Sequence, residues 1–496
     1  MNGASVTPVA GIDYDRSAVS VGIVHFGVGN FHRSHQAMYL DRLLRDPATF
    51  EAARTWGICG IGVLPGDRAM RDALGGQDFE YTLVERHPDG TAPATRIGSL
   101  VDYLYAPDQL EEVLELLAAP TTRIVSLTIT EGGYNISDVT GEFDVANPAI
   151  VADARPGAAP ATVFGIIVAG LARRRERGIP PFTLMSCDNI EGNGDVARRT
   201  FAAFARLVDP ELAAWIERGV RFPNCMVDRI TPVTSDADRA WVAETFGVQD
   251  AWPVLCEDFV QWVLEDEFGD PEAGGGRPPW ERAGVQLVED VRPYELMKLR
   301  LLNASHQALA YAGILAGYEF AHDATRDPVI ARYLRAYMDR EGTPTLEPVP
   351  GVDLDAYKSK LIERFSNEYV RDTLGRLATD ASDRIPKWLV PVIRELRASG
   401  RRAPLSASIV AGWARYAERV VAGEALPFRD RQEDAVRDAV ARMAGDPLGF
   451  LRNPDWFGGL PDDDGFVADF TASLAAFRGS DDPRPELERL LAGPAA

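Results

Sequence analysis

Strand-like and helix-like runs alternate through the first half of the chain. The strand-like runs are short and rich in β-branched and apolar residues, and the runs between them carry apolar residues at helical spacing. The strand-like runs are Val21–Phe26, Trp56–Val63, Tyr81–Glu85, Arg123–Thr130 and Phe182–Ser186, and the helix-like runs are Ser34–Leu44, Leu110–Ala118 and Ala161–Arg175. Such alternation predicts a mostly parallel sheet with helices on both faces.

Beyond Tyr294 helical periodicity dominates, so the second half is expected to be mainly α-helical. The helix-like runs there are Glu295–Leu315, Pro328–Met338, Ala356–Arg364 and Ser406–Val421. A loop with three glycines and three prolines, Asp270–Pro279, precedes the change and marks the approach to a domain boundary. We therefore expect an α/β fold with a Rossmann-like domain over residues 1–288 and a helical domain over residues 289–496.

Length and charge narrow the class of protein. A chain of 496 residues favours two domains, and 52 Lys and Arg against 74 Asp and Glu give a net charge of −22. That charge repels nucleic acid and anionic membranes, and a small anionic ligand would need a local positive field. The four cysteines lie far apart, which favours reduced thiols, and neither a signal peptide nor a membrane span is apparent. We expect a cytoplasmic protein without nucleic-acid or membrane partners.

The first strand-like run ends in Gly27-Val28-Gly29 and leads directly into a helix-like run. In dinucleotide-binding turns the first glycine permits the tight bend and the second lets the backbone approach a pyrophosphate at a helix N-terminus. His32 stands where a third glycine is usual, and a plain strand–helix turn is the alternative interpretation. The turn predicts cofactor contacts from Gly27, Gly29, Asn30 and Phe31.

Two histidines, His32 and His35, lie three residues apart at the start of this helix-like run. Nearby carboxylates or cysteines do not complete a ligand set, so no metal is expected. We expect the two histidines and Arg33 to line a phosphate or the mouth of a substrate site. A capping or surface role is the alternative.

Polar residues also follow later strands, at the edge where open α/β sheets bind ligands. Asp67 follows the second strand and is the candidate for binding a ribose diol, which favours NAD over NADP, although Arg68 beside it would suit a 2′-phosphate. Glu131 and Asn189 follow two further strands, and Asp228 precedes a predicted loop edge. Each of the last three is also compatible with an ordinary cap or turn.

The largest group of candidate catalytic residues lies on the helix-like run after residue 292. At about 100° per residue, Glu295, Lys298, Asn303 and His306 share one face with several leucines. Unpaired Lys and Glu on an apolar face are costly, so these groups either satisfy one another or line a pocket.

This face suits the oxidation of an alcohol. The reaction needs a base with a pKa near the working pH, and burial brings a lysine there. An asparagine amide donates to developing alkoxide charge. Lys298 is therefore the candidate base, Asn303 the candidate donor and His306 an orienting donor. Tyr294 and Lys298 also form the Tyr-x-x-x-Lys pair of short-chain dehydrogenases, but that family has a different glycine turn and much shorter chains.

Seven blocks together resemble the long-chain polyol dehydrogenases. They are HFGVGNFHRSHQ, SLTITEGGYN, MSCDNIEGNG, FPNCMVDRITP, VLCEDFVQWVLED, the helix with Lys298, Asn303 and His306, and RFSNEYVRDTLGRLATDASDRIPKW. They occur in the family's order from about Gly22 to Lys387. The resemblance implies a monomer that interconverts D-mannitol and D-fructose with NAD and without a metal, built from a Rossmann-like and a helical domain.

The resemblance also implies roles for the catalytic candidates. Lys298 matches the family's general base. Asn303 and Asn189 match the two arms of its oxyanion hole. His306 matches a residue that positions the substrate or tunes the base.

Other matches concern the substrate and the cofactor. Asp228 matches a residue that positions the substrate or tunes the base, Glu295 a carboxylate of the proton path and Arg376 a substrate-contacting arginine. Arg384 stands where a lysine occurs in the family, which keeps the charge but alters the contact geometry. The family's acidic pair after the second strand is reduced to Asp67 and its neighbouring glycine, which weakens the expectation of strict NAD use.

Other functions compete with polyol oxidation. Hexuronate reductases of the same superfamily, acting on fructuronate or tagaturonate, tend to show Glu-Lys-Gly-Tyr where this chain has Glu131-Gly132-Gly133-Tyr134. A lysine there can pair with a substrate carboxylate and a glycine cannot, which favours a neutral polyol. Mannitol, arabinitol and sorbitol remain open as substrates. A nucleotide-binding scaffold without catalysis is disfavoured by the convergent polar residues.

Overall fold

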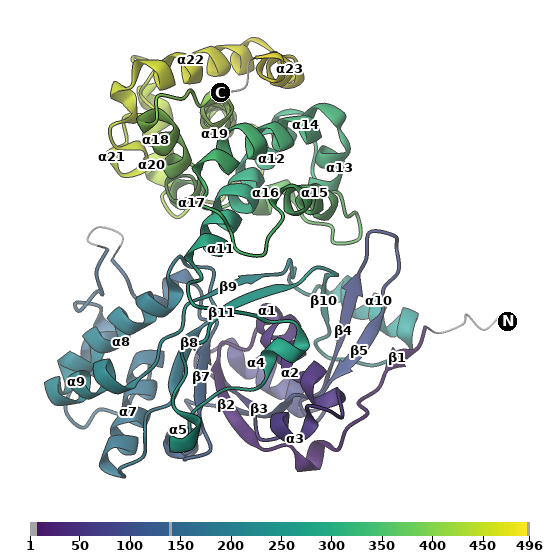
Figure 1. Cartoon of the computed structure of the whole chain (residues 1–496). Helices are drawn as coiled ribbons and strands as arrows, with labels where there is room; N and C mark the ends of the chain where they lie inside the picture. Colours follow the sequence, from purple (N-terminus) through teal and green to yellow (C-terminus); the bar gives the residue numbers. More distant parts are fainter. Residues whose placement is uncertain (1–6, 138–140, 494–496) are drawn as a thin grey trace. The chain divides into compact units, whose positions relative to one another are not determined.

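The computed structural model describes residues 7–137 and 141–493. Its first part is built around a five-stranded parallel sheet (Figure 1). Its strands lie in the order β6-β3-β2-β7-β8, with bounds β2 (Val21–Phe26), β3 (Gly57–Gly62), β6 (Leu100–Tyr105), β7 (Ile124–Leu127) and β8 (Thr183–Ser186). This is the Rossmann order, in which the chain adds two strands on one side of the first and then two on the other. The carboxyl end of β2 therefore lies where the order reverses, the usual place for a ligand.

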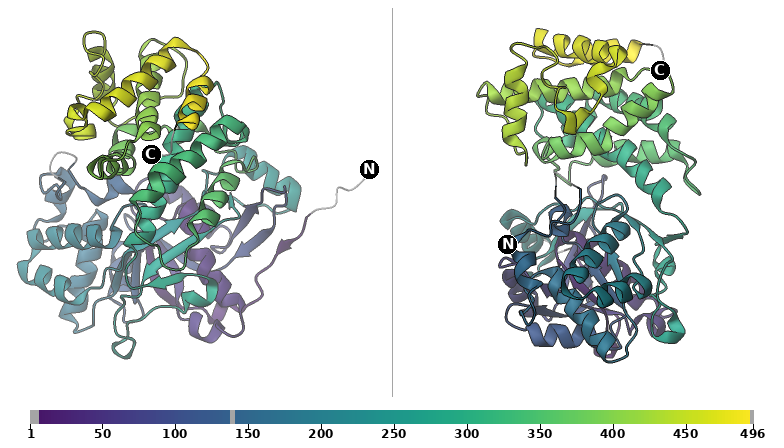
Figure 2. Two further views of the ribbon diagram at one scale, coloured as in Figure 1. Left: turned by 45° about the horizontal axis from the view of Figure 1, so that its top comes forward. Right: turned by 90° about the vertical axis from the view of Figure 1, so that its left-hand side faces the viewer.

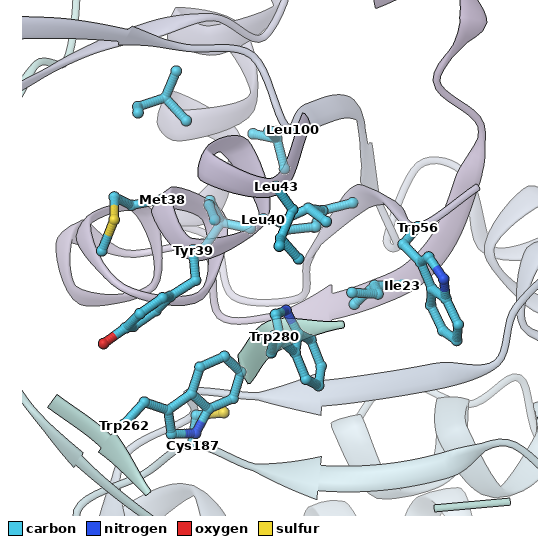
Figure 3. Packing of buried hydrophobic residues seen from close by; sticks show 14 of the residues in the cluster. Ile23, Met38, Tyr39, Leu40, Leu43, Trp56, Leu100, Cys187, Trp262 and Trp280 are labelled. Atoms are coloured by element: carbon cyan, nitrogen blue, oxygen red, sulfur yellow. The ribbon is translucent and has the colours of Figure 1, made fainter. Parts of the chain in front are cut away.

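Helices cover both faces of this sheet. Successive side chains of each strand point to opposite faces, so each strand contributes to two hydrophobic cores. Ile23 of β2 belongs to one core, and its neighbours Val24 and Phe26 belong to the other. Figure 1 shows the helices on the two sides: α2 (Gln36–Arg45) and α4 (Asp67–Gly75) on one, and α5 (Leu110–Ala118), α7 (Val163–Glu176) and α8 (Asn193–Val208) on the other. Figure 3 shows part of the first core, where the rings of Trp262 and Trp280 pack in a tilted arrangement with centroids 4.8 Å apart.

One predicted strand is present, but it belongs to a different sheet from the one expected. Residues 81–85 do form a strand, but it belongs to a separate sheet of order β1-β5-β4-β10, with bounds β1 (Val9–Ala10), β4 (Tyr81–Arg86), β5 (Ala94–Ile97) and β10 (Val254–Glu257). The third strand of the parallel sheet is β6, whose apolar run is interrupted by Asp102 and so gave a weak signal. A third sheet has the order β12-β11-β9, with bounds β9 (Cys225–Asp228), β11 (Gln261–Glu265) and β12 (Gln286–Val288).

The chain divides by its internal contacts into two units, Met1–His87 with Thr91–Arg292, and Pro88–Gly90 with Pro293–Ala496. The Gly- and Pro-rich loop lies inside the first unit and contains a short 3₁₀ turn, η3 (Pro271–Ala273). The change of unit comes later, at the start of α11 (Arg292–Met297).

The second unit is built from helices, as its periodicity predicts. Its principal helices are α12 (Ala304–Leu315), α14 (Pro328–Tyr337), α15 (Leu354–Phe365), α16 (Leu374–Leu377), α17 (Ala381–Trp388), α19 (Pro404–Val421), α20 (Glu433–Arg442), α22 (Asp464–Gly479) and α23 (Arg484–Ala492). Every residue of α12 except His306 is buried. In Figures 1 and 2 the yellow α22 lies beside the green α19, which also packs on α12.

Two segments of the second unit are π-helical, η5 (Lys298–Asn303) and η6 (Met338–Gly342). At the end of η5 the N–H of Ala304 donates to the carbonyl of Leu299, five residues earlier. The prediction of an uninterrupted α-helix over Glu295–Leu315 was therefore wrong in this turn. Its residues are all buried, so the apolar pattern carries no sign of the wider turn.

Candidate active site

The glycine turn at the end of β2 needs its two glycines for different reasons. Gly27 has φ +92°, and a Cβ there would lie 2.2 Å from the carbonyl oxygen of Thr128, so only glycine fits. Gly29 precedes α1 (Asn30–Ser34), and the nearest atom to an added Cβ would be the Gly27 oxygen, 3.8 Å away. The protein itself leaves this space open, which fits the close approach of a pyrophosphate.

This difference predicts the effects of two alanine substitutions. Gly29→Ala is expected to leave the unfolding temperature unchanged and to weaken NADH binding by about tenfold or more, because the methyl group would occupy the ligand's space. Gly27→Ala is expected to lower the unfolding temperature as well, because it combines backbone strain with a steric clash. Thermal unfolding and fluorescence titration with NADH distinguish the two. Unchanged NADH affinity in Gly29→Ala would contradict the assignment.

The side chains of Asn30 and Phe31 anchor the turn. The Asn30 amide donates to the carbonyl of Pro232 and the hydroxyl of Thr234, both at 2.9 Å. The Phe31 ring stacks on His35 with centroids 4.9 Å apart. These contacts occupy the side chains, so cofactor contacts from these two residues would come from their backbone.

The same contacts join the turn to the strand that carries another predicted residue. Pro232 and Thr234 belong to the loop that follows β9, and Asp228 is the last residue of that strand. Asp228 is buried and faces Gln261 of β11 in the antiparallel register. The turn and the end of β9 thus belong to one connected region of the first unit.

The expectation that His32, Arg33 and His35 line a phosphate or a substrate mouth is not met. All three side chains are buried in the core beneath the turn. The His32 ring stacks on His25 at 3.5 Å, and burial lowers the pKa of both rings, to about 3 for His25. Arg33 donates to the Asn30 side chain at 2.8 Å. Over residues 7–137 and 141–493, no group of three His, Cys, Asp or Glu side chains is arranged to hold a metal.

Asp67 lies at the start of α4, next to the end of β3. Its Oδ2 accepts the backbone N–H groups of Val63 and Leu64, both at 2.8 Å, which fixes the carboxylate and leaves Oδ1 for a ribose hydroxyl. The neighbouring Arg68 donates to Asp108 at 2.8 Å. This pairing opposes the alternative in which Arg68 accepts a 2′-phosphate.

Glu131 and Asn189 are exposed residues that follow the neighbouring strands β7 and β8. Asp188, which the sequence reasoning missed, joins their loops. Its carboxylate accepts the backbone N–H groups of Thr130 and Ile129 at 2.8 and 3.1 Å, and it also accepts the Tyr134 hydroxyl at 2.8 Å. Its place directly before Asn189, at the carboxyl end of a strand, was the available signal.

Asp188 predicts a specific dependence of stability on pH. Burial raises its pKa to about 6, whereas an unfolded Asp titrates near 3.9. Between these values the folded state holds a proton that the unfolded state has lost. The free energy of unfolding should therefore fall by about 1.4 kcal/mol per pH unit as the pH rises through this window, and stay level above it.

Asp188→Asn removes this titration, so its unfolding free energy should show a shallower fall between about pH 4 and pH 6. Urea unfolding across this range measures the slopes. Asp236→Asn, at an exposed carboxylate, is the matched control and should keep the wild-type slope. Equal slopes in the wild type and Asp188→Asn would exclude Asp188 as the source.

In the second unit, Glu295, Lys298 and Asn303 are buried, with Lys298 about 7% exposed. Lys298 and Asn303 are the first and last residues of the π-helical segment η5. Hydrogen bonds from i to i+5 make this turn wider than an α-helical turn, so more residues are needed to complete it. An α-helix would separate these two side chains by about 140°. The π turn narrows this angle, which brings the predicted base and the predicted amide donor closer together on the face that the sequence predicts.

His306 lies one turn further on, within a group of cations. Burial lowers the pKa of its ring well below the usual value, and the charges of Arg376, Arg364, Arg384 and Lys298 act in the same direction. The structure therefore brings together four predicted residues, His306, Lys298, Arg376 and Arg384, and adds the buried Arg364, which sequence reasoning missed. The imidazole is neutral at physiological pH and can act as a hydrogen-bonding group without a charge.

The two predicted substrate arginines differ in their partners. Arg376, whose side chain is about half exposed, pairs with Asp372 one turn earlier. Arg384 donates to the carbonyls of Arg376 and Leu377, both at 3.2 Å. Arg384 therefore also holds the turn that carries Arg376.

Family models match both parts of the chain. The model described as the mannitol dehydrogenase Rossmann domain matches residues 21–281, and the model for the mannitol dehydrogenase C-terminal domain matches residues 290–478. A mannitol 2-dehydrogenase of Phaeosphaeria nodorum is 45% identical over 469 residues, which cover 93% of this chain and 80% of that protein. A mannitol dehydrogenase of Saccharomyces cerevisiae is 44% identical, covering 93% and 91%.

Two solved structures are similar over nearly their full length. Pseudomonas fluorescens mannitol 2-dehydrogenase, in a ternary complex with NAD and D-mannitol, matches with a TM-score of 0.87 and 44% identity over 99% of this chain and 98% of that one. A substrate-free D-sorbitol dehydrogenase matches with a TM-score of 0.85 and 37% identity over 97% and 98%. In the part of the chain that the structure describes, no helix is both long and apolar enough to cross a membrane.

Proposed function

The chain belongs to the mannitol dehydrogenase family, and from this premise we propose that it interconverts D-mannitol and D-fructose with NAD. The observation that carries the proposal is the π turn, which sets the buried Lys298 and Asn303 on one face. A base and an amide donor on one face match what the oxidation of a secondary alcohol requires.

The proposed roles follow from the chemistry of each side chain. Lys298 removes the proton of the reacting hydroxyl, and Glu295, three residues earlier, passes that proton on. Asn303 and Asn189 donate amide N–H groups to the oxygen as it gains negative charge. His306 donates a hydrogen bond that orients the substrate. Bound NAD supplies a carbon that accepts hydride.

The residues of the first unit fit a bound dinucleotide. The backbone at Gly27, Gly29, Asn30 and Phe31 would hold the pyrophosphate, since the space over Gly29 is open. Asp67 would hold the ribose diol through Oδ1. Glu131, exposed at the end of β7, would contact the cofactor at the same edge of the sheet. No metal is required in this scheme.

For the substrate, we assign contacts to Asp228, Arg376 and Arg384. Hexuronate reductases tend to show Glu-Lys-Gly-Tyr at positions 131–134. Glycine at position 132 leaves no lysine there to pair with a substrate carboxylate, which supports a neutral polyol over a hexuronate. Similarity to a D-sorbitol dehydrogenase keeps sorbitol, and with it arabinitol, among the polyols to be tested.

Purified enzyme with NADH and a panel of ketoses and ketouronates tests this function. Fructose is expected to be reduced fastest. Failure to oxidise NADH above background with every ketose would contradict polyol dehydrogenase activity. Rapid turnover of fructuronate without turnover of fructose would assign the chain to the hexuronate reductases.

The fixed carboxylate of Asp67 predicts that NADH is used better than NADPH. It would repel a 2′-phosphate, so we expect kcat/KM to be higher with NADH by about tenfold or more. Asp67→Ala should reduce this ratio mainly through its effect on NADH. Equal catalytic efficiencies of the wild type with the two cofactors would refute the role.

We further propose that residues 1–288 form the NAD-binding domain and residues 289–496 the substrate and catalytic domain, in a monomer that works in the cytoplasm. The family resemblance supports the monomer, and four buried, unpaired cysteines suit a reducing compartment. Size-exclusion chromatography with light scattering tests the oligomeric state.

A further inference from the structure

A cavity of about 560 Å³ with several charged side chains in its wall lies within the second unit, between η6, the start of α19, α22 and α23. This volume is in the range of small-molecule sites. The charged residues of its wall are Arg340, Arg401, Arg402, Arg489, Glu341 and Asp469. None of these residues takes part in the proposed polyol chemistry.

The arginines give the cavity a positive field in a chain whose net charge is −22. Arg340 donates to the carbonyls of Leu491 and Gly493, at 3.2 and 3.3 Å, near the end of α23. Within residues 7–137 and 141–493, Arg340 makes no ion pair with a carboxylate. Arg489 pairs with Glu486, which lies outside the cavity wall, and its side chain is largely exposed.

The two carboxylates of the wall are used differently. Glu341 caps α19, because it accepts the backbone N–H groups of Leu405 and Ser406, both at 2.7 Å, and the Ser406 hydroxyl. Asp469 is about 7% exposed and pairs with Arg402 through Oδ1. Its Oδ2 is buried and has no hydrogen-bond partner among the described residues.

An unsatisfied buried carboxylate oxygen is costly, and a hydroxyl group from a ligand would satisfy it. Planar guanidinium groups suit phosphate oxygens. Arg489 is paired with Glu486, and the other three arginines outnumber the two carboxylates of the wall, so an anionic phosphate monoester offsets the excess of positive charge. A neutral sugar would leave this excess of positive charge uncompensated.

We propose that this cavity is a second ligand site, which binds a small phosphate monoester that carries a hydroxyl group. The phosphate contacts the arginines, including Arg340 and Arg402, and the hydroxyl donates to Oδ2 of Asp469. The cavity lies close to the π turn of Lys298 and Asn303, because η6 packs against η5. The Tyr337 hydroxyl, directly before η6, donates to the carbonyl of Arg300 at 3.0 Å.

Isothermal titration calorimetry of the full chain saturated with NADH tests the proposal, with glycerol 1-phosphate as the probe. NADH occupies the glycine turn, so phosphate binding there is blocked. We expect saturable binding of one probe per chain and none of glycerol. Methyl phosphate, which has no hydroxyl for Asp469, should bind about tenfold more weakly.

Arg340→Gln and Arg402→Gln should each weaken binding of the probe by about tenfold or more. Arg402 is largely exposed, so its variant tests the site even if Arg340→Gln does not fold. Arg437→Gln, at a surface pair with Glu433 on α20, is the matched control and should bind normally. Absence of saturable binding at millimolar probe, or equal binding in the cavity variants and the control, would overturn the proposal.

Discussion

Replacing Lys298 by alanine is expected to lower kcat/KM for mannitol oxidation by about 10³-fold, because the variant has no base for the hydroxyl proton. NADH binding should be unchanged, because the proposed cofactor contacts, at the glycine turn and Asp67, do not include Lys298. Steady-state kinetics and NADH titration measure the two effects separately.

Lys360→Ala is the matched control. Lys360 is a partly exposed lysine of α15 that pairs with Glu363, and its loss should change kcat/KM little. Added primary amines should partly restore turnover in Lys298→Ala if the missing function is proton transfer. Turnover of Lys298→Ala within a few-fold of wild type would exclude this lysine as the base, and a scaffold without catalysis would show no turnover in either protein.

Replacing Asn303 by alanine is expected to lower kcat by about 10²–10³-fold, the usual cost of removing one oxyanion donor. The effect should fall mainly on kcat, because the amide acts on charge that develops in the transition state. Asn303→Asp keeps the shape of the side chain but replaces the donor by an acceptor. It should therefore be at least as impaired as the alanine variant.

Asn189→Ala provides an independent measure, because it removes the second proposed donor from a different loop. If both amides act on the same oxygen, the double variant should lose more than either single variant, with a coupling that differs from simple addition. Recovery of activity in Asn303→Asp would show instead that Asn303 serves only packing in the π turn.

Most of the fold could be predicted because its signals are local. The strand Val21–Phe26 and the helix Leu110–Ala118 have the predicted bounds, since alternation and helical spacing are visible within a few residues. The third strand of the parallel sheet could not be predicted in the same way, because Asp102 breaks its apolar run. Which sheet a strand joins depends on pairing with distant residues, as β4 demonstrates.

The candidate site was predictable as a set of side chains but not as an arrangement. The amphipathic pattern singled out Lys298, Asn303 and His306, although it assumed an α-helix where the chain forms a π turn. The sequence suggested that His32 meets a ligand, but the ring lies in the core beneath the turn, stacked on His25. These outcomes depend on neighbours that are far away in the sequence.

Local pattern and composition were thus sufficient to predict the α/β and helical halves, the glycine turn and the residue types of the candidate site. Tertiary packing alone established the π turn of the helix that carries Lys298, the cations around His306, the link that Asp188 makes between two loops, and the arginine-lined cavity. The physical reason is that hydrophobic periodicity is a property of neighbouring residues. Burial, charge clustering and hydrogen-bond satisfaction are set by residues that meet only in the folded chain.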